Sequence, residues 1–380
     1  MTAAYELALL GEPSAEQEAE IRGLVADLIA QFGLALGTDV AWHVRPAVFA
    51  PSGLRSAAAL FFGAPGISPP AGLADLQRSV PIVPVVSALS RASTELPSEL
   101  RGLNALVYAE AGARRVATAL LECAGLLPRQ RRVFVSYRRD EARAAALQLF
   151  DAFSARQFDV FLDTHGVAPG DDFQSTLWHR LCDSDVLVML DTQTYFASRW
   201  TAAEYGRALA KSIAVLRVGW PDCAASPRTS TASQVVLADG DVDRASGTLT
   251  ADAVAGVCSQ LELLRGKSIA VRRTNLVSGL VKSVERIEGR MEGIGIGNGV
   301  YLTLRDGRQL VAFPTVGVPT SLSLHQAFSL SSDRRSVVLY DHVGLHKDWL
   351  DHLAWLGEQI ARPRWIRASE AAWDLGDWVD

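Results

Sequence analysis

The sequence VFVSYRRD at residues 133–140 has the pattern of an apolar strand that ends in a small hydroxyl, an aromatic ring and two cations. In an open α/β sheet, ligands bind at the carboxyl ends of the strands. We therefore expect Tyr137, Arg138 and Arg139 where a nucleotide would sit, since guanidinium groups suit phosphates and an aromatic ring suits a base. Ordinary surface arginines after a strand would give the same pattern, so this segment alone leaves both interpretations open.

Downstream of this strand, apolar runs alternate with apolar residues at helical spacing. The pattern predicts strands at 159–162, 186–190 and 213–218 and helices at 144–155, 173–182 and 198–211. A loop rich in Pro, Ser, Thr and Asp is expected at 221–250, and a helix from 251 to about 264 is expected to close the domain. This series predicts a flavodoxin-like, doubly wound parallel sheet over residues 129–275.

The expected strand at 159–162 leads into a loop at 163–172 that holds two glycines and a proline, which allow sharp turns. Asp163 opens the loop and Asp172 closes it at the start of the next helix. A carboxylate at that position can cap the helix and favour its positive end. A simple connecting loop would carry the same residues.

The segment SRWTAAE at 198–204 places Trp200 and Glu204 four residues apart, and hence on one face of a helix that Ser198 can cap. A carboxylate beside an aromatic wall could hold a ribose through its hydroxyls. It could also stabilise an oxocarbenium-like transition state, as glycosidase carboxylates do. An isolated pair at this spacing is more often a core tryptophan next to a solvated glutamate.

Taken in this order, the segments resemble TIR domains, with an FxSYR-type first strand, a DxFLD strand running into a GxxxGD loop, and a WxxxE helix. The resemblance covers residues 132–221 most firmly. It implies a five-stranded parallel sheet and, in catalytic members, an NAD+ glycohydrolase or cyclase activity. The helix glutamate of those members, here Glu204, is the catalytic carboxylate.

The same resemblance assigns substrate-binding roles to Tyr137, Arg138 and Trp200, and to Asp163 and Asp172 at the two ends of the loop. That loop matches the BB loop of the family, which gates the pocket and contacts a neighbouring TIR domain. NAD+ is then a substrate, with no cofactor and no metal. The resemblance further implies self-association and a bacterial anti-phage effector that an unknown protein or nucleotide signal activates.

Two other functions fit the same residues. One is a non-enzymatic TIR scaffold that recruits partners through its loop, and Glu204 argues against it because a scaffold does not need this carboxylate. The other is a nucleotide-binding sensor whose ligand sits on one of the flanking domains.

The flanking segments have periodic patterns of their own. Residues 1–128 alternate strands with helices, including a capping box at Ser14 and Gln17, and predict an α/β domain that is either a degenerate TIR-like copy or a sensor. Residues 276–380 predict an α/β or α+β domain with a hairpin about Asp306-Gly307, a strand at 336–340 and a helix at 348–360.

Composition excludes several classes of function. Of 380 residues, 49% are hydrophobic, and the net charge of −5 gives no basic excess for nucleic acid. Four separated cysteines form no CxxC pair, so a structural zinc site of that type is not expected. Of His342, His346 and His352, which lie among several aspartates, His346 and His352 lack the i,i+4 spacing of a helical metal pair, so a metal site is not expected there. With no leader and no apolar membrane span in the sequence, we expect a cytoplasmic protein.

Overall fold

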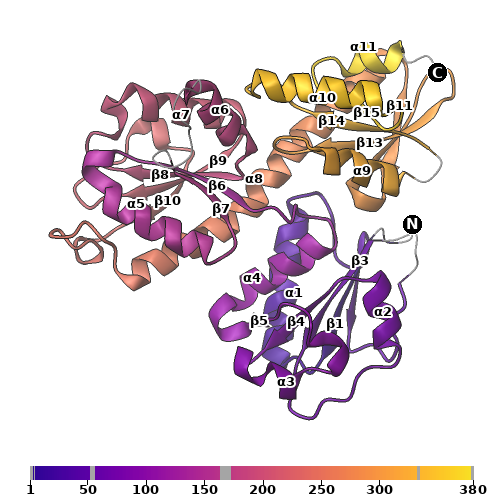
Figure 1. The fold of residues 1–380 in the computed structure, drawn as a ribbon, viewed down its shortest axis with the longest axis horizontal. Helices are drawn as coiled ribbons and strands as arrows, with labels where there is room; N and C mark the ends of the chain where they lie inside the picture. Colours follow the sequence, from indigo (N-terminus) through magenta and orange to yellow (C-terminus); the bar gives the residue numbers. More distant parts are fainter. Residues whose placement is uncertain (1–2, 4, 52–55, 163–172, 332–333, 378–380) are drawn as a thin grey trace. The chain divides into compact units, whose positions relative to one another are not determined.

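The computed structural model describes residues 3, 5–51, 56–162, 173–331 and 334–377 (Figure 1). The chain divides into two compact units, of which the first comprises Met1–Arg129 with Ile294–Asn298 and the second Gln130–Gly293 with Gly299–Asp380. The strands of the described residues form three sheets of five strands each. No helix in these parts of the chain has both the length and the apolar character that a membrane crossing requires.

The N-terminal sheet has the strand order β2-β1-β3-β4-β5, and its strands pair in parallel. Its strands are β1 (Tyr5–Gly11), β2 (Val40–Val44), β3 (Ser56–Phe62), β4 (Ile82–Val86) and β5 (Leu106–Val107). Its helices are α1 (Ala15–Ala30), α2 (Leu73–Ser79), α3 (Ala92–Glu95) and α4 (Tyr108–Cys123). The predicted capping box is confirmed, because the Ser14 hydroxyl and the Gln17 side chain each accept from the other residue's backbone N–H at the start of α1.

The central sheet has the order β10-β9-β8-β6-β7, again with parallel pairing throughout. Its strands are β6 (Arg132–Ser136), β7 (Asp159–Leu162), β8 (Val186–Asp191), β9 (Ala214–Gly219) and β10 (Ser233–Val236), and its helices are α5 (Arg139–Ser154), α6 (Phe173–Asp183) and α7 (Arg199–Ala210). In order of appearance along the chain, the strands lie 2-1-3-4-5. This confirms the predicted flavodoxin-like sheet.

Apolar side chains cover both faces of the central sheet. Buried residues of α5 and of the long helix α8 (Ala251–Arg286) pack on one face, and buried residues of α6 and α7 pack on the other. Figure 1 shows these two layers on opposite sides of the strands. The carboxyl ends of β6, β8 and β9 therefore meet at one edge between the helix layers.

The structure corrects two expectations in this region. Strand β10 lies inside the segment that was predicted to be only a loop; its four residues SQVV are all partly or fully exposed, so no continuous apolar run marked it. Helix α8 does not end near 264 but continues to Arg286 across position 275. It continues because apolar residues keep helical spacing, and Leu280 and Val284 pack into the core of the third sheet.

The C-terminal sheet has the order β11-β12-β13-β14-β15. Its strands are β11 (Arg290–Ile294), β12 (Val300–Thr303), β13 (Gln309–Thr315), β14 (Arg335–Tyr340) and β15 (Arg364–Arg367), with helices α9 (Ser321–Leu330), α10 (Lys347–Gln359) and α11 (Ala371–Gly376). The predicted hairpin is present as the antiparallel pair β12–β13, whereas β13, β14 and β15 are parallel. The mixed sheet packs against α8 and α11 on one face and α9 and α10 on the other.

Candidate functional site

The central sheet gathers polar side chains at or near the ends of its first, third and fourth strands. Ser136 ends β6, Asp191 ends β8, and Arg217 lies two residues before the end of β9. Strand β6 lies between β7 and β8, so the chain reverses its direction of travel across the sheet at this point. In open α/β sheets the crevice at such a reversal is the usual ligand site.

Glu204 lies on α7, directly against this edge. Its side chain is buried, with the residue 4% exposed, and its carboxylate accepts a hydrogen bond from the Ser136 hydroxyl. The helix start is fixed by Ser198, whose hydroxyl accepts from the backbone N–H of Trp200 at 3.2 Å. Helix α7 lies in the connection between β8 and β9, and it places the Glu204 carboxylate against the end of β6, the first strand of the sheet.

A buried tyrosine extends this contact into a chain of hydroxyl groups. The hydroxyl oxygens of Tyr195 and Ser136 are 2.6 Å apart. Because Ser136 donates its only hydroxyl hydrogen to Glu204, Tyr195 is the donor to Ser136. Burial first, and then the charge of Glu204, raise the pKa of Tyr195 well above its ordinary value, so the phenol stays neutral and keeps its proton to donate.

A buried ion pair holds the next two strand ends together. The Arg217 Nε donates to Asp191 Oδ2 at 2.5 Å, and both side chains are almost completely buried. Burial raises the pKa of Asp191 above its ordinary value, although the hydrogen bond and the charge of Arg217 oppose that rise. Gly219 leaves room for this pair, because a Cβ there would lie 2.5 Å from the Arg217 guanidinium.

The start of α5 is tied to the loop that follows β8. Thr194 donates to the Glu141 carboxylate through its hydroxyl at 2.6 Å and its backbone N–H at 3.3 Å. Burial raises the pKa of Glu141, but the hydroxyls of Thr192 and Thr194 and the charge of Arg138 outweigh it and lower the pKa below its ordinary value. Glu141 therefore remains ionised at the rim of the site.

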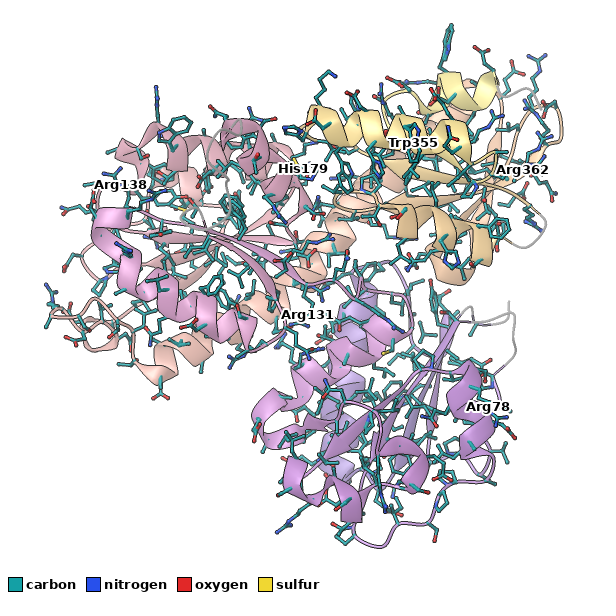
Figure 2. All side chains as sticks on the ribbon, viewed as in Figure 1. Arg78, Arg131, Arg138, His179, Trp355 and Arg362 are labelled. Atoms are coloured by element: carbon teal, nitrogen blue, oxygen red, sulfur yellow. The ribbon has the colours of Figure 1, made fainter. Side chains whose placement is uncertain are left out.

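The site residues that were predicted from the sequence differ in how far they are buried and in where they lie at this edge. Tyr137 is only 6% exposed, and its hydroxyl is buried without a hydrogen-bond partner among the described residues. Arg138 lies at the start of α5 (Figure 2), and Trp200 is 38% exposed with the Arg199 guanidinium 4.6 Å from its ring. Asp163 and Asp172 lie outside the described residues.

The alternative interpretation of the Trp200–Glu204 pair is reversed by the structure. A core tryptophan next to a solvated glutamate was the ordinary explanation of this spacing, but here the glutamate is buried and the tryptophan is exposed. The spacing therefore places a carboxylate, rather than an aromatic ring, in the interior.

Four site residues were not singled out from the sequence: Ser136, Tyr195, Asp191 and Arg217. Two of them carried a usable signal, because Asp191 and Arg217 are charged residues within otherwise apolar strand segments, and such residues are almost never buried without a partner. Ser136 was visible within the strand-end motif, and nothing in the sequence indicated Tyr195. Among the described residues, no three His, Cys, Asp or Glu side chains group as a metal site requires.

Fold and site together define the class of protein: a flavodoxin-like α/β domain with a buried carboxylate, bound to a serine, at the carboxyl ends of its strands. Residues 133–248, which run from β6 to beyond β10, match the family model of the TIR domain. The chain therefore contains a TIR domain. A comparison with curated proteins gave no match.

Proposed function

We propose that the TIR domain cleaves the bond between nicotinamide and ribose in NAD+, and that Glu204 is its catalytic carboxylate. The observation that carries this proposal is the buried Glu204 carboxylate, which is joined to the Ser136 hydroxyl at the carboxyl edge of the sheet. The TIR family includes NAD+-cleaving members, and a carboxylate is the group that such a cleavage needs. NAD+ is the substrate in this proposal, and no recycled cofactor takes part.

The proposed chemistry follows from charge development on the ribose. As the bond from ribose C1′ to the nicotinamide nitrogen breaks, its electron pair leaves with nicotinamide, and positive charge spreads over C1′ and the ring oxygen. A carboxylate in a water-poor pocket stabilises that charge far better than one in bulk water. Water then adds at C1′ and loses a proton to give ADP-ribose, or adenine N1 adds to give a cyclic product.

The hydroxyl chain gives Glu204 a fixed orientation. Tyr195 donates to Ser136, and Ser136 donates to Glu204, so the carboxylate cannot rotate freely before the substrate arrives. Groups that are already oriented need no rearrangement when charge develops in the transition state. In this proposal, Ser136 and Tyr195 position the carboxylate, and Glu204 is the residue that touches the ribose.

We further propose that assembly and the flanking domains control the reaction. TIR domains commonly self-associate, and the loop at residues 163–172 matches the family's BB loop. Both flanking segments fold around cores of their own. A bacterial anti-phage effector whose activity is released by a protein or nucleotide signal accounts for such domains beside an enzyme that would deplete its host of NAD+.

The proposal is tested by incubating the purified full chain with NAD+ over a wide range of protein concentrations, with and without a crowding agent that promotes assembly. Nicotinamide and ADP-ribose or its cyclic form are separated by chromatography and identified by mass. We expect little release from the dilute chain and a rise steeper than linear as the chain assembles. Assembled, folded protein that releases no nicotinamide would favour the non-enzymatic scaffold.

A further inference from the structure

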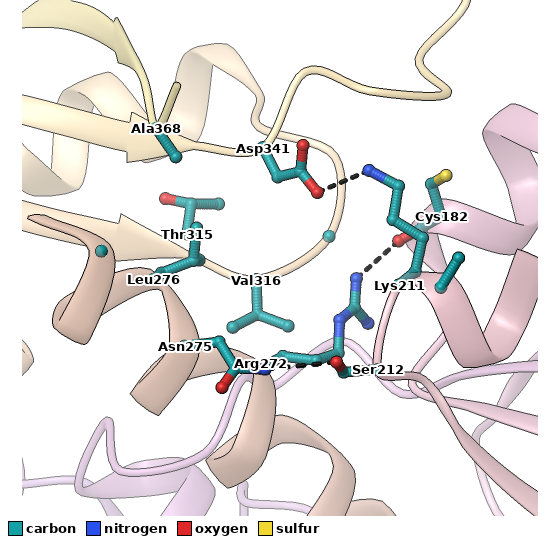
Figure 3. Close-up of a pocket in the computed structure, with 13 residues that line it drawn as sticks. Cys182, Lys211, Ser212, Arg272, Asn275, Leu276, Thr315, Val316, Asp341 and Ala368 are labelled. Atoms are coloured by element: carbon teal, nitrogen blue, oxygen red, sulfur yellow. Dashed lines mark hydrogen bonds and ion pairs between the residues drawn. The ribbon is translucent and has the colours of Figure 1, made fainter. Parts of the chain in front are cut away.

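A second cavity lies within the second unit, separate from the Glu204 edge. Its volume is about 250 Å³ (Figure 3). It lies where the carboxyl ends of the parallel strands β13, β14 and β15 face α8 and the residues just after α7, and Thr315, Asp341 and Ala368 mark those strand ends. This is again the edge of an open α/β sheet at which ligands bind.

Two cations and one carboxylate lie around the cavity, and Figure 3 shows Lys211 and Arg272 on one side of it, facing Asp341 and Val316. The Lys211 ammonium contacts Asp341 Oδ2 at 2.5 Å, while Asp341 Oδ1 accepts from the backbone N–H of Val343 at 3.0 Å. Both oxygens of the carboxylate are therefore already hydrogen-bonded.

Lys211 and Arg272 have more N–H donors than their hydrogen bonds within the protein use. Arg272 donates to the backbone carbonyls of Ser184 and Cys182, at 2.8 Å each, through two different nitrogens. A guanidinium carries five N–H donors and an ammonium carries three, so Arg272 and Lys211 have further donors. The lining of the cavity thus has more hydrogen-bond donors than acceptors and more positive than negative charge. Such a lining favours a ligand with negatively charged oxygen atoms.

The rest of the lining limits the size and polarity of the ligand. Ala210, Leu276 and Val316 form apolar parts of the wall, and the Asn275 amide donates to the Ser212 hydroxyl at 3.2 Å. Sites for drug-sized ligands are about 300–1,000 Å³, so this cavity is suited to a smaller molecule. An anionic group beside the cations and a short carbon skeleton against the apolar wall would fill it.

We propose that this cavity is a binding site for a small organic anion, a molecule with one phosphate or carboxylate group on a short carbon skeleton. The ligand oxygens accept from Lys211 and Arg272, and Lys211 exchanges part of its contact with Asp341 for the ligand. The proposal does not depend on NAD+ cleavage, because none of these residues lies at the Glu204 edge.

The test is isothermal titration calorimetry on the full chain, with ribose 5-phosphate as the phosphate probe, lactate as the carboxylate probe and ribose as the neutral control. We expect saturable binding of at least one charged probe and none of ribose, and the stronger charged probe identifies the preferred group. Failure of both charged probes to saturate at millimolar concentration would overturn the proposal.

Three variants locate the binding. Lys211→Met should weaken it about tenfold or more, since it removes a charged hydrogen-bond donor. Asp341→Asn should strengthen it about two- to fivefold, because the competing carboxylate of a partly exposed pair is lost. Lys347→Met is the matched control, since Lys347 forms an exposed pair with Asp351 of the same 2.5 Å length. Equal binding by the Lys211 and Lys347 variants, or no gain in the Asp341 variant, would contradict the site.

Discussion

The N-terminal and central sheets place their five parallel strands in the same order, yet the first strand of each ends differently. In the central sheet the last residue of that strand is Ser136, which donates to Glu204. In the N-terminal sheet it is Gly11, where a Cβ would lie 2.1 Å from the backbone oxygen of Phe62. The first strand of the central sheet therefore ends in a polar side chain at the reversal point, whereas the first strand of the N-terminal sheet ends in close contact with backbone.

A second comparison of the two sheets shows that a buried serine–glutamate pair alone does not identify a candidate catalytic site. Glu95 on α3 is 2% exposed and accepts from both the backbone N–H and the hydroxyl of Ser87, which lies only eight residues away. That pair ties down one local connection after β4. The Ser136–Glu204 pair joins segments 68 residues apart, at the reversal of strand order. Function depends on where the carboxylate lies in the fold.

The largest expected effect is a loss of stability, and it comes from a substitution in the fourth strand of the central sheet. Strand β9 of the central sheet contains buried Arg217, whereas β4 of the N-terminal sheet reads IVPVV. Arg217→Met leaves Asp191 buried without its partner, so we expect the free energy of unfolding to fall by about 3–5 kcal/mol. Chemical denaturation measures this loss.

The matched control is Arg244→Met, which removes a cation that pairs at the surface with Asp222 and Asp239. Its unfolding free energy should change by less than about 0.5 kcal/mol. Equal losses in the two variants would show that the buried pair does not hold the central edge.

The second prediction compares the two buried glutamates. Glu204→Gln should lower the rate of nicotinamide release by about 10²–10³ with the fold retained, because it removes the charge that stabilises the transition state. Glu95→Gln removes a carboxylate with similar burial from the other sheet and should leave the rate unchanged. Circular dichroism checks folding in both. Near wild-type turnover by folded Glu204→Gln protein would reject its catalytic role.

A third, smaller effect is expected for the two serines. Ser136→Ala removes the hydrogen bond that orients the Glu204 side chain, so the rate of nicotinamide release should fall about tenfold. Ser87→Ala removes the corresponding donor to Glu95 and should leave the rate unchanged. If Ser136 only positions Glu204, Ser136→Ala in a Glu204→Gln background should cause no further loss. A further tenfold loss there would mean that Ser136 acts on the substrate itself.

The smallest effect concerns acid stability. Helices α1 to α4 of the N-terminal sheet contain no histidine, whereas α6 of the central sheet carries His179 (Figure 2). The His179 ring accepts a hydrogen bond from the backbone N–H of His346. Burial first, and then nearby positive charges, lower the pKa of His179 from 6.5 to about 4. The unfolded chain therefore binds this proton more readily, and the stabilisation that is complete above pH 6.5 is lost as the pH falls towards 4.

For a single partly exposed group, that loss stays below about 1.4 kcal/mol for each pH unit. His179→Gln should flatten the pH dependence of the unfolding free energy over this window, as followed by urea denaturation at a series of pH values. His325→Gln, an exposed histidine on α9, serves as control. Identical pH dependence in the wild type and in His179→Gln would contradict the assignment.

The sequence predicted most of the central fold because its strands are continuous apolar runs, which are buried on both faces of a parallel sheet. The predicted strand at 186–190 and the observed β8, Val186–Asp191, differ by one residue. β10 was missed because its SQVV sequence is partly or fully exposed throughout and carries no such run. The length of α8 was missed because its second half packs against a sheet that is distant in sequence.

The candidate site was predicted less completely than the fold. Glu204 could be selected because its spacing from Trp200 fits one helix face. Tyr195 could not be selected, since its role arises from a contact with Ser136, 59 residues away, that only folding creates. The pairing of Asp191 with Arg217 likewise joins the ends of two strands, and sequence gives their charges without their distance.

Amide hydrogen exchange on the full Glu204→Gln chain, with and without NAD+, tests most directly whether NAD+ binds at the Glu204 edge, because this variant should bind NAD+ and cleave it only slowly. We expect slower exchange in residues 137–142 and 192–204, which border the carboxyl edge of the central sheet. We expect no change in residues 12–14 and 87–95 at the edge of the N-terminal sheet. Protection confined to the N-terminal segments, or no protection at the central edge at saturating NAD+, would contradict binding of NAD+ beside Glu204.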